Sequence, residues 1–329
     1  MYLAQPNRYE DMQYRRVGAS GLKISAISLG LWHNFGDVDV LSRQREIIHT
    51  AFDHGITYFD LANNYGPPAG SAEINFGRIL REDLAQYRDE MVISSKAGYY
   101  MWPGPYGEWG SKKNIIASCD QSLTRMGLDY VDIFYHHRPD PDTPLGETAQ
   151  ALDQLVRQGK ALYIGISNYN AAQTRAITKI FKQLKTPFIV NQVRYNMLDR
   201  WVEDDGLLDT LSELNKGMVA FSPLAQGRLT DRYLHGIPTD SRANRSSSPF
   251  LDQEKVAPTV KIAAQLNELA QQRGQSLAEM ALAWNLKNQV VASVIVGASR
   301  PSQLQDNLKA LGNLDFSRYE IEQIEQILK

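Results

Sequence analysis

The sequence predicts a parallel α/β fold, a (β/α)8 TIM barrel with an N-terminal β-hairpin and a long loop after strand 7. Eight short apolar, β-branched runs recur along the 329 residues, and amphipathic helical segments alternate with them. Most neighbouring runs lie roughly 30 residues apart, the length of a strand–helix–strand unit that makes a parallel sheet. Eight parallel strands can close, so we expect residues 1–329 to form a single (β/α)8 barrel domain. An open, doubly wound sheet is the alternative, because periodicity does not reveal closure.

The first predicted element is a β-hairpin over Met12–Ile24, whose arms Met12–Val17 and Lys23–Ile27 flank a turn of small residues at Gly18–Gly21. The barrel strands follow. Each is four to eight residues long, as expected of a strand that is buried on both faces. They are predicted at Ile24–Leu31, Ile56–Phe59, Met91–Ser95, Val131–Tyr135, Ala161–Ile166, Phe188–Val193, Gly217–Phe221 and Ala292–Val296.

Helices are predicted between the strands, where apolar residues recur at spacings of three and four. The clearest are Arg43–His54, Ser111–Met126 and Leu145–Gln158. A glycine stands at or just after the end of each, the usual signal that a helix terminates. These glycines are Gly55, Gly127 and Gly159.

One connection is much longer than the others. Residues Gly227–Pro258, between the seventh and eighth strands, are rich in Arg, Ser and Pro. A loop of this length inside a compact domain is either functional or disordered. Because it directly follows a barrel strand, we expect it to act as a lid over a cofactor or substrate.

Composition excludes several classes of protein. Lys and Arg number 35 against 37 Asp and Glu, a net charge of −2, which predicts no nucleic-acid or anionic-membrane partner. Cys119 is the single cysteine, so a disulfide framework and a multi-cysteine zinc site are excluded. The charged N-terminal residues do not resemble a signal peptide, and no apolar run approaches the ~20 residues of a membrane span. These features predict a cytoplasmic protein.

The active site of such a barrel lies at the C-terminal ends of its strands. The residues that follow each apolar run are therefore the candidates for chemistry, and every run is followed by a group that can hydrogen-bond, ionise or approach a ligand closely. They are Gly30 to Trp32, Asp60 with Tyr65, Lys96, His136 and His137, Ser167 and Asn168, Gln192, Ser222 and Pro223, and Gly297 to Ser299.

Asp60, Tyr65, Lys96 and one histidine suit carbonyl reduction, a reaction that creates an alkoxide and must protonate it. A free tyrosine has a pKa near ~10, too high for efficient proton exchange at neutral pH. A neighbouring Lys96 ammonium should lower the pKa of Tyr65, and Asp60 should keep a partly buried Lys96 charged. No Ser or Cys shares these strand ends with a histidine–carboxylate pair, which argues against nucleophilic catalysis.

Each of these residues also has an ordinary structural interpretation. Asp60 could cap the following turn, Lys96 could be a solvated strand end, and Tyr65 could pack under the two prolines that follow it. His136 and His137 are adjacent on a strand and must point to opposite faces, so only one can face the site. Phe134, Tyr135 and His136 could equally pack under the helices.

The same residues resemble the aldo-keto reductase family. Asp60 and Tyr65 stand five positions apart within Phe59–Gly66, followed by Ser71–Glu73 and Gly77, as in that family's signature. The resemblance extends in order from Met12 to the last helix. The further matching blocks are Ser94–Lys96, Asp132–Pro139, Gly165–Tyr169, Asn191–Asn196, Phe221–Gly227, and Gly297–Ser299 with Gln303 and Asn307.

The resemblance implies a (β/α)8 barrel that binds NADP(H) without a Rossmann fold, in agreement with the absence of a G-x-G-x-x-G motif. It implies that Tyr65 is the general acid, that Lys96 and Asp60 tune it, and that His137 orients the carbonyl. Alignment through Asp132 and Pro139 selects His137 over His136.

The resemblance also implies the cofactor contacts. Ser167, Asn168 and Gln192 would bind the nicotinamide carboxamide, and Phe221 would stack on its ring. Arg232 and Arg242 would bind the 2′-phosphate, which favours NADP over NAD because a guanidinium can grip phosphate with two hydrogen bonds. The remaining contacts would be Trp32, Asp60, Ser222, Leu224, Gln226, Ser299, Gln303 and Asn307.

Within the family, the segments around Trp32–Gly36, Tyr65–Pro68 and Met101–Gly107 resemble the bacterial branch that reduces glyceraldehyde 3-phosphate and methylglyoxal, a relative of potassium-channel β-subunits. The predicted function is NADPH-dependent reduction of small aldehydes. One alternative is a redox-sensing regulatory subunit that binds cofactor and a membrane channel but turns over slowly. Another is a metal-dependent hydrolase using Asp60 and His137, although the strand ends offer few ligands. A homo-oligomer is compatible with the sequence, since isologous interfaces leave no pattern in one chain.

Overall fold

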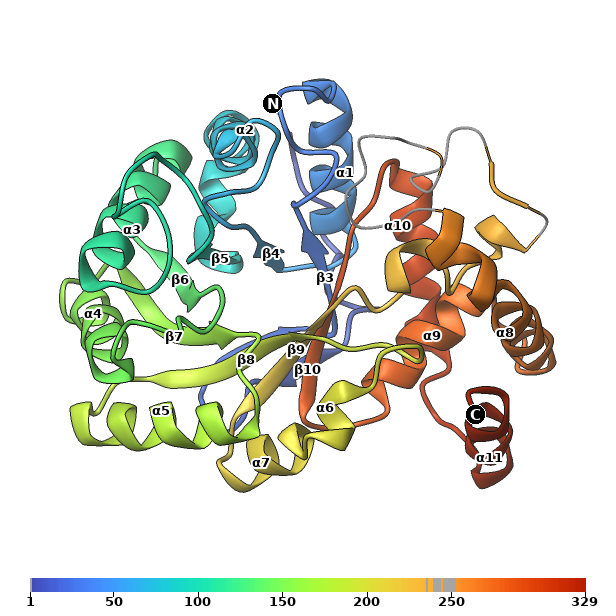
Figure 1. Ribbon diagram of the computed structural model, residues 1–329. Helices are drawn as coiled ribbons and strands as arrows, with labels where there is room; N and C mark the ends of the chain where they lie inside the picture. The colour runs from blue at the N-terminus through green and yellow to red at the C-terminus, as the bar shows by residue number, and fades with distance from the viewer. Residues whose placement is uncertain (1, 235, 239–243, 245–252) are drawn as a thin grey trace.

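The computed structural model describes residues 2–329 except 235, 239–243 and 245–252. Its eight central strands form a closed parallel barrel in the order β10-β3-β4-β5-β6-β7-β8-β9 (Figure 1). The sheet is therefore a closed barrel, and the alternative of an open, doubly wound sheet is wrong. The strands are β3 (Ile27–Gly30), β4 (Tyr58–Asp60), β5 (Val92–Ala97), β6 (Val131–His136), β7 (Ala161–Ser167), β8 (Phe188–Arg194), β9 (Gly217–Phe221) and β10 (Val291–Val296).

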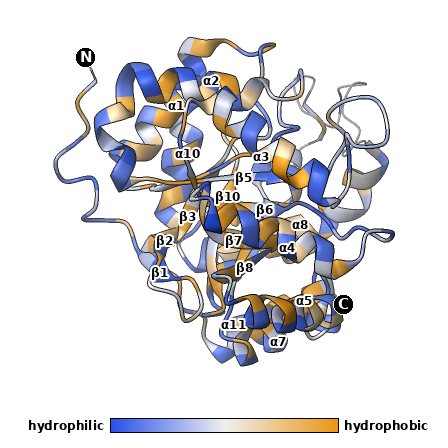
Figure 2. Cartoon of the chain, turned by 90° about the vertical axis from the view of Figure 1, so that its left-hand side faces the viewer, coloured by the Kyte–Doolittle hydropathy of each residue, from blue (hydrophilic) through white to orange (hydrophobic). Residues whose placement is uncertain are grey.

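Helices surround this barrel, and Figure 2 shows hydrophobic residues on the strands inside the ring of helices. Several helices begin where the sequence supplies a cap: Ser111 accepts a hydrogen bond from the backbone N–H of Asn114, and Asn170 forms a capping box with Gln173. The described helices are α1 (Leu41–Asp53), α2 (Ser71–Ile79), α3 (Lys112–Met126), α4 (Leu145–Arg157), α5 (Ala171–Leu184), α6 (Trp201–Asp204), α7 (Leu207–Glu213), α8 (Gln253–Gln272), α9 (Leu277–Leu286), α10 (Pro301–Leu308) and α11 (Arg318–Ile327).

The predicted N-terminal hairpin is present, but it takes part of the first predicted barrel strand. β1 (Tyr14–Arg16) pairs antiparallel with β2 (Lys23–Ser25). The run Ile24–Leu31 is therefore not one strand, because its first residues pair with β1 and its later ones with β10, starting from Ile27. The apolar run has no break in its sequence, but it is divided because its first part pairs antiparallel with β1 and its last part pairs parallel with β10.

The core has two layers. One apolar cluster fills the space between the barrel and the helices. A second and smaller cluster lies inside the barrel and includes Val17 and Ile24 from the hairpin region together with Ile133, Val190 and Val219 from the strands. The hairpin region therefore contributes apolar side chains to the barrel interior from the end where the strands begin.

The predicted long loop ends earlier than the sequence indicated. The helix α8 begins at Gln253 and contains Pro258, which we expected to close the loop. Val256 in the first turns of α8 is buried against Tyr233 of the short helical turn Asp231–Tyr233, and this contact favours a helix before the proline. Across the part of the chain that the structure describes, no helix combines the length and apolar character needed to cross a membrane.

Candidate active site

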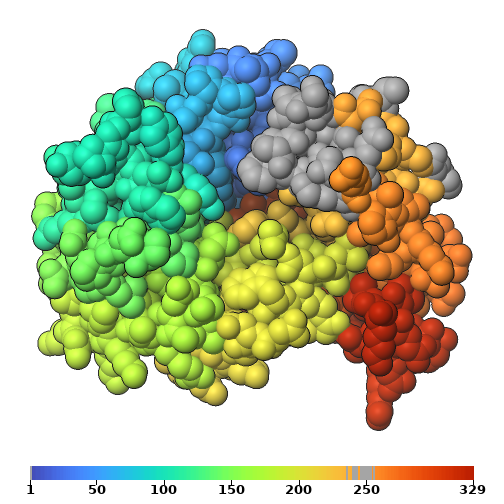
Figure 3. All heavy atoms as spheres, in the orientation of Figure 1, coloured from blue at the N-terminus to red at the C-terminus, as the bar shows by residue number. Residues whose placement is uncertain are grey.

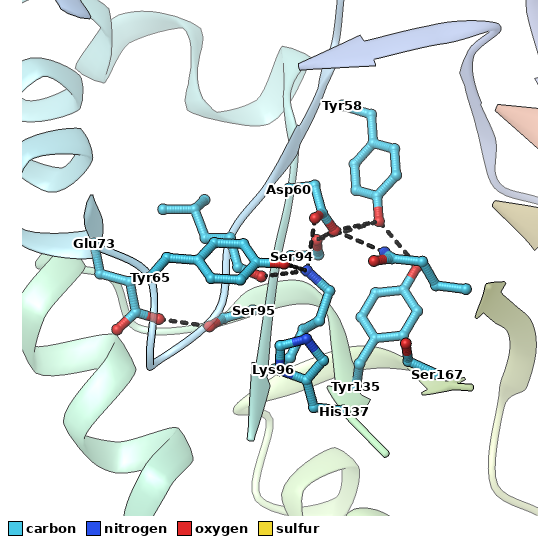
Figure 4. A network of polar contacts seen from close by, with 12 residues as sticks. Tyr58, Asp60, Tyr65, Glu73, Ser94, Ser95, Lys96, Tyr135, His137 and Ser167 are labelled. Atoms are coloured by element: carbon cyan, nitrogen blue, oxygen red, sulfur yellow. Dashed lines mark hydrogen bonds and ion pairs between the residues drawn. The ribbon is translucent and has the colours of Figure 1, made fainter. Parts of the chain in front are cut away.

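The candidate site lies where β4, β5 and β6 end (Figure 4). Asp60 is the last residue of β4, Lys96 is the next-to-last residue of β5, and His137 directly follows β6. Tyr65 comes from the loop between β4 and α2. Parallel pairing of these strands brings together side chains that are far apart in the sequence. Figure 3 shows that the molecule is hollowed near the centre of one face.

Lys96 is the centre of the cluster. Its Nζ donates to Asp60 Oδ2 at 2.6 Å, to the Leu61 carbonyl at 2.7 Å and to the Tyr65 hydroxyl at 3.2 Å. The side chain is fully buried, so these three acceptors replace water for the three protons of the ammonium. The structure thus brings Asp60, Lys96 and Tyr65 into one hydrogen-bonded group.

Burial decides the protonation of this group. It lowers the pKa of Lys96 below its usual value, and the charge of Asp60 opposes the shift, as the sequence predicted. The expectation for Tyr65 was wrong: burial raises its pKa well above 10, and Asp60 and Tyr99 add to the rise. The nearby ammonium does not outweigh the loss of water around the phenol, so Tyr65 is a neutral proton donor in this structure.

The two adjacent histidines point in opposite directions, as strand alternation requires. The ring of His137 lies edge-on to Tyr65, with centroids 5.9 Å apart, and to Tyr99 at 4.6 Å. The Nδ1 of His136 instead lies 2.6 Å from the hydroxyl of Tyr169. Burial lowers the pKa of both rings, to about 4 for His136 and well below 6.5 for His137, so both are neutral at pH 7.

The search of the strand ends did not predict a role for three hydroxyl-bearing residues that lie beneath Asp60. Asp60 Oδ1 accepts hydrogen bonds from Gln192 Nε2 at 2.8 Å, Ser94 Oγ at 3.0 Å and Tyr58 OH at 3.2 Å. Tyr135 OH lies 2.9 Å from Tyr58 OH, inside the barrel and not under the helices as its alternative interpretation had it. Tyr58, Ser94 and Tyr135 each stand two residues before Asp60, Lys96 or His137, so strand alternation could have found them.

The predicted nicotinamide contacts border the same group. Asn168 adopts a left-handed backbone with φ of 63°, and its Nδ2 donates to the His137 carbonyl and to Ser167 Oγ, each at 3.1 Å. Trp32 lies near Tyr65, with ring centroids 6.2 Å apart. Gln192, expected to bind the carboxamide, donates to Asp60 in this structure.

The remaining predicted contacts lie at the ends of β9 and β10. Phe221 is partly buried at the last position of β9, with Leu224 in the turn that follows. Ser222 and Gln226 have left-handed φ values of 54° and 59°, a strain that functional sites often carry. After β10, Gln303 Oε1 accepts from the backbone N–H of Ser299 at 3.0 Å.

Two observations bear on whether these residues fit a polar ligand. The buried Nδ2 of Asn307 and the buried Nδ1 of His137 have no hydrogen-bond partner among the described residues, and buried polar atoms normally have one. Both are available for contacts to a bound molecule, as is the unpartnered Nε2 of His136. Arg232 is exposed on the turn Asp231–Tyr233, whereas Arg242 lies outside the described residues.

Asp60 is not arranged as a metal ligand, because one oxygen is paired with Lys96 and the other accepts three hydrogen bonds. Residues 2–329, apart from the gaps named above, contain no group of three or more His, Cys, Asp or Glu side chains that could hold a metal ion. The donor set thus favours proton transfer over metal ligation.

The chain is similar to known proteins over nearly its whole length. The family model described as "Aldo/keto reductase family" matches residues 26–329. The L-glyceraldehyde 3-phosphate reductase of Escherichia coli K12 is 56% identical over 332 residues, covering 99% of this chain and 95% of that protein. A probable voltage-gated potassium channel subunit beta of Arabidopsis thaliana is 36% identical over 322 residues, 97% of each chain. The solved holo form of an aldo-keto reductase from Bacillus halodurans superposes with a TM-score of 0.77 at 25% identity, covering 97% of each chain.

Proposed function

Because the chain belongs to the aldo/keto reductase family, a family of nicotinamide-dependent enzymes, we propose that it reduces small aldehydes to primary alcohols with NADPH. The overall reaction consumes one aldehyde, one NADPH and one proton, and yields one alcohol and NADP⁺. The observation that carries the proposal is the buried Lys96, which donates to both Asp60 and Tyr65.

Tyr65 is the general acid in this proposal. When bound, the cofactor supplies the hydride that the carbonyl carbon accepts, and Tyr65 gives its proton to the carbonyl oxygen. Burial keeps the phenol protonated before the reaction, which suits a donor. The Lys96 ammonium, 3.2 Å from the hydroxyl, then stabilises the phenolate that is left behind. Asp60 offsets the cost of keeping that ammonium buried.

His137 positions the carbonyl. Its neutral ring stands edge-on to Tyr65 and can donate one N–H to the same carbonyl oxygen, so that the substrate is held where the phenol can reach it. His136 is bonded to Tyr169 away from this point and takes no part. The unpartnered Nδ1 of His137 supports a contact that forms only with a bound molecule.

The NADPH contacts proposed are those that the family resemblance implies. Ser167, Asn168 and Gln192 would hold the carboxamide, with Phe221 against the ring. The amide of Asn307 is available for a ligand because it is buried without a partner among the described residues. Arg232 and Arg242 would bind the 2′-phosphate and set the preference for NADPH over NADH.

The substrate class follows from the name of the E. coli relative, whose aldehyde carries a phosphate. Arg138 follows His137, and its guanidinium is held 4.2 Å from the ring centroid of Tyr99 and 3.7 Å from that of Trp109. The guanidinium is also ion-paired with Glu108, so the terminal phosphate of a short aldehyde would bind Arg138 in place of that carboxylate. Methylglyoxal, which has no phosphate, would be reduced without this contact.

The test is NADPH oxidation measured with a matched panel of short aldehydes, each with and without a phosphate. We expect turnover with several members and a lower KM for the phosphorylated ones. A lower KM for the free aldehydes would remove the role of Arg138 and leave the reductase assignment standing. Absence of turnover with every member would overturn the proposal.

A second candidate is a cofactor-binding regulatory subunit, favoured by the similarity to the Arabidopsis channel subunit beta. Such a protein would bind NADPH tightly and oxidise it slowly with any aldehyde. Comparing the affinity for NADPH with steady-state turnover separates the two candidates, because only the reductase combines binding with rapid oxidation.

A further inference from the structure

The interior of the barrel holds a polar cluster that the proposed proton transfer does not use. It consists of Tyr58 on β4, Ser94 on β5 and Tyr135 on β6, here called the hydroxyl trio (Figure 4). All three side chains are completely buried. Burying a hydroxyl costs free energy unless it is hydrogen-bonded, so three of them side by side need an explanation.

The hydrogen bonds of the trio converge on Asp60. Tyr58 OH lies 3.2 Å from Asp60 Oδ1 and 2.9 Å from Tyr135 OH, and Ser94 Oγ lies 3.0 Å from the same carboxylate oxygen. An ionised carboxylate can only accept, so Tyr58 donates to Asp60. The one proton of Tyr58 is then used, and Tyr135 must donate to Tyr58. The donors therefore form a directed chain that ends on the negative charge.

The neighbouring strand makes room for this chain. Tyr135 pairs with Gly165 of β7, and a Cβ atom at position 165 would lie 2.3 Å from the Tyr135 ring. Only a residue without a side chain lets the ring occupy the interior beside Tyr58. The position of the Tyr135 ring thus depends on two strands, β6 that carries it and β7 whose glycine leaves space for it.

We propose that the hydroxyl trio is a set of positioning residues that holds the Asp60 carboxylate in place and aims its Oδ2 at Lys96. The claim rests on the proposed function only for its consequence in catalysis. With Oδ1 held by Tyr58 and Ser94 of the trio and by Gln192, the carboxylate cannot rotate away from the Lys96 Nζ atom, 2.6 Å from Oδ2. A buried ammonium with no water needs such a partner, because an unpaired buried charge is strongly unfavourable.

The other groups around Lys96 do not supply this support. Glu73 of α2 also attracts Lys96, but its carboxylate is already bonded to Arg125 of α3 and to Ser95. Tyr65 accepts from Lys96, and the ring of His137 is neutral. The titratable and charged groups that face the Asp60–Lys96 pair are Tyr58, Tyr65, Glu73, Tyr135 and His137, with Arg125 behind Glu73 and Arg138 behind His137.

The experiment measures the protonation of Lys96 directly in the protein without nucleotide. Lysine labelled with ¹³C at Cε is titrated by NMR, and the Lys96 signal is assigned from its loss in Lys96→Met. Tyr58→Phe should lower the pH midpoint of Lys96 by about one unit, a tenfold change in its protonation equilibrium. The sign follows because an Asp60 carboxylate that loses a donor to Oδ1 can rotate its Oδ2 away from the Lys96 Nζ atom. Tyr135→Phe should produce a smaller shift in the same direction, since Tyr135 reaches Asp60 only through its partners Tyr58 and Gln192.

The matched control is Tyr169→Phe. It removes a buried tyrosine hydroxyl that bonds His136 Nδ1 at 2.6 Å, away from Asp60, and should leave the Lys96 midpoint unchanged. Should Tyr58→Phe fail to fold, Ser94→Ala removes a second donor to the same oxygen and should shift the midpoint in the same direction. An unchanged midpoint in whichever of these two variants folds, or an equal shift in Tyr169→Phe, would overturn the proposal.

The same variants connect the trio to catalysis. For Tyr58→Phe the alkaline limb of the kcat profile should move to lower pH by the same amount as the NMR midpoint, with KM for the aldehyde unchanged. A change in KM alone would assign Tyr58 to the substrate pocket and overturn the positioning role. If wild-type protein reduces no aldehyde while the NMR shift is observed, the proposed function fails and the role of the trio in holding Asp60 stands.

Discussion

The two ends of the barrel are built from the same strands but filled in opposite ways. At the end where the strands begin, Val17 and Ile24 of the hairpin region are fully buried among apolar side chains. The polar groups there satisfy one another, as Ser28 and Ser293 do at 2.6 Å. At the other end, the buried side chains are ionisable ones: Asp60, Lys96 and His137. One ring nitrogen of His137 has no hydrogen-bond partner among the described residues.

The difference indicates that the residues that stabilise the fold and the residues that carry the chemistry lie at opposite ends of the barrel axis. Apolar contacts at the hairpin end cost nothing to bury, whereas a buried ion pair at the other end contributes little to stability. Substitutions at the two ends should therefore have opposite signatures. Changes to Asp60, Lys96, Tyr65 or His137 at the catalytic end should reduce turnover, and changes at the hairpin end should reduce the free energy of unfolding.

The largest expected effect is at Tyr65. Tyr65→Phe removes the proposed proton donor but keeps the ring, so kcat should fall by ~10²–10⁴-fold while NADPH affinity and Tm stay close to wild type. Steady-state turnover with a saturating aldehyde, a fluorescence titration of NADPH and a thermal melt measure the three quantities. Turnover within a few-fold of wild type would show that another group protonates the product.

The hairpin end provides the complementary test. Ile24→Ala leaves a cavity in the barrel interior and should lower the free energy of unfolding by about 2–4 kcal/mol, with kcat unchanged at temperatures where the protein is folded. Urea unfolding followed by circular dichroism gives the first number. A loss of kcat larger than the loss of folded protein would mean that the two ends are coupled, and the separation argued above would fail.

The adjacent histidines His136 and His137 allow the same comparison, between an effect on turnover and an effect on stability, at the end of a single strand. His137→Ala should lower kcat/KM by roughly 10²-fold because it removes a donor beside Tyr65. His136→Ala instead removes a buried hydrogen bond to Tyr169 and should lower the free energy of unfolding by about 1–3 kcal/mol, with little effect on kcat/KM. Equal or reversed effects on kcat/KM would show that His136, not His137, serves the reaction.

The smallest expected effect concerns the loop after β9. Arg232→Ala or Arg242→Ala should weaken NADPH binding and leave NADH binding nearly unchanged, which would narrow the preference for NADPH by about tenfold. Titrating each variant with both nucleotides provides its own control, because NADH lacks the 2′-phosphate. Parallel losses for the two nucleotides would mean that these arginines are ordinary surface cations.

Much of the fold could be predicted because its signals are local. Apolar runs and the helical periodicity between them placed the strands and helices to within a few residues, and capping residues such as Ser111 and Asn170 lie at helix starts. The predicted ends of strands and helices were wrong where a segment that is distant in the sequence packs against them. β10 takes the end of the run that starts at Ile24, and Tyr233 stabilises the start of α8 before Pro258. That residues 1–329 act as a single domain stays a prediction.

By itself, the sequence determined which residues reach the C-terminal ends of the strands, because strand alternation and chain order are local properties. Only the tertiary structure decided that the sheet closes, and that Tyr58, Ser94 and Tyr135 meet beneath Asp60. It also decided that burial raises the pKa of Tyr65 despite the nearby ammonium. Burial and convergence arise from segments that are far apart in the chain, and no local pattern records how much water those segments exclude from a side chain.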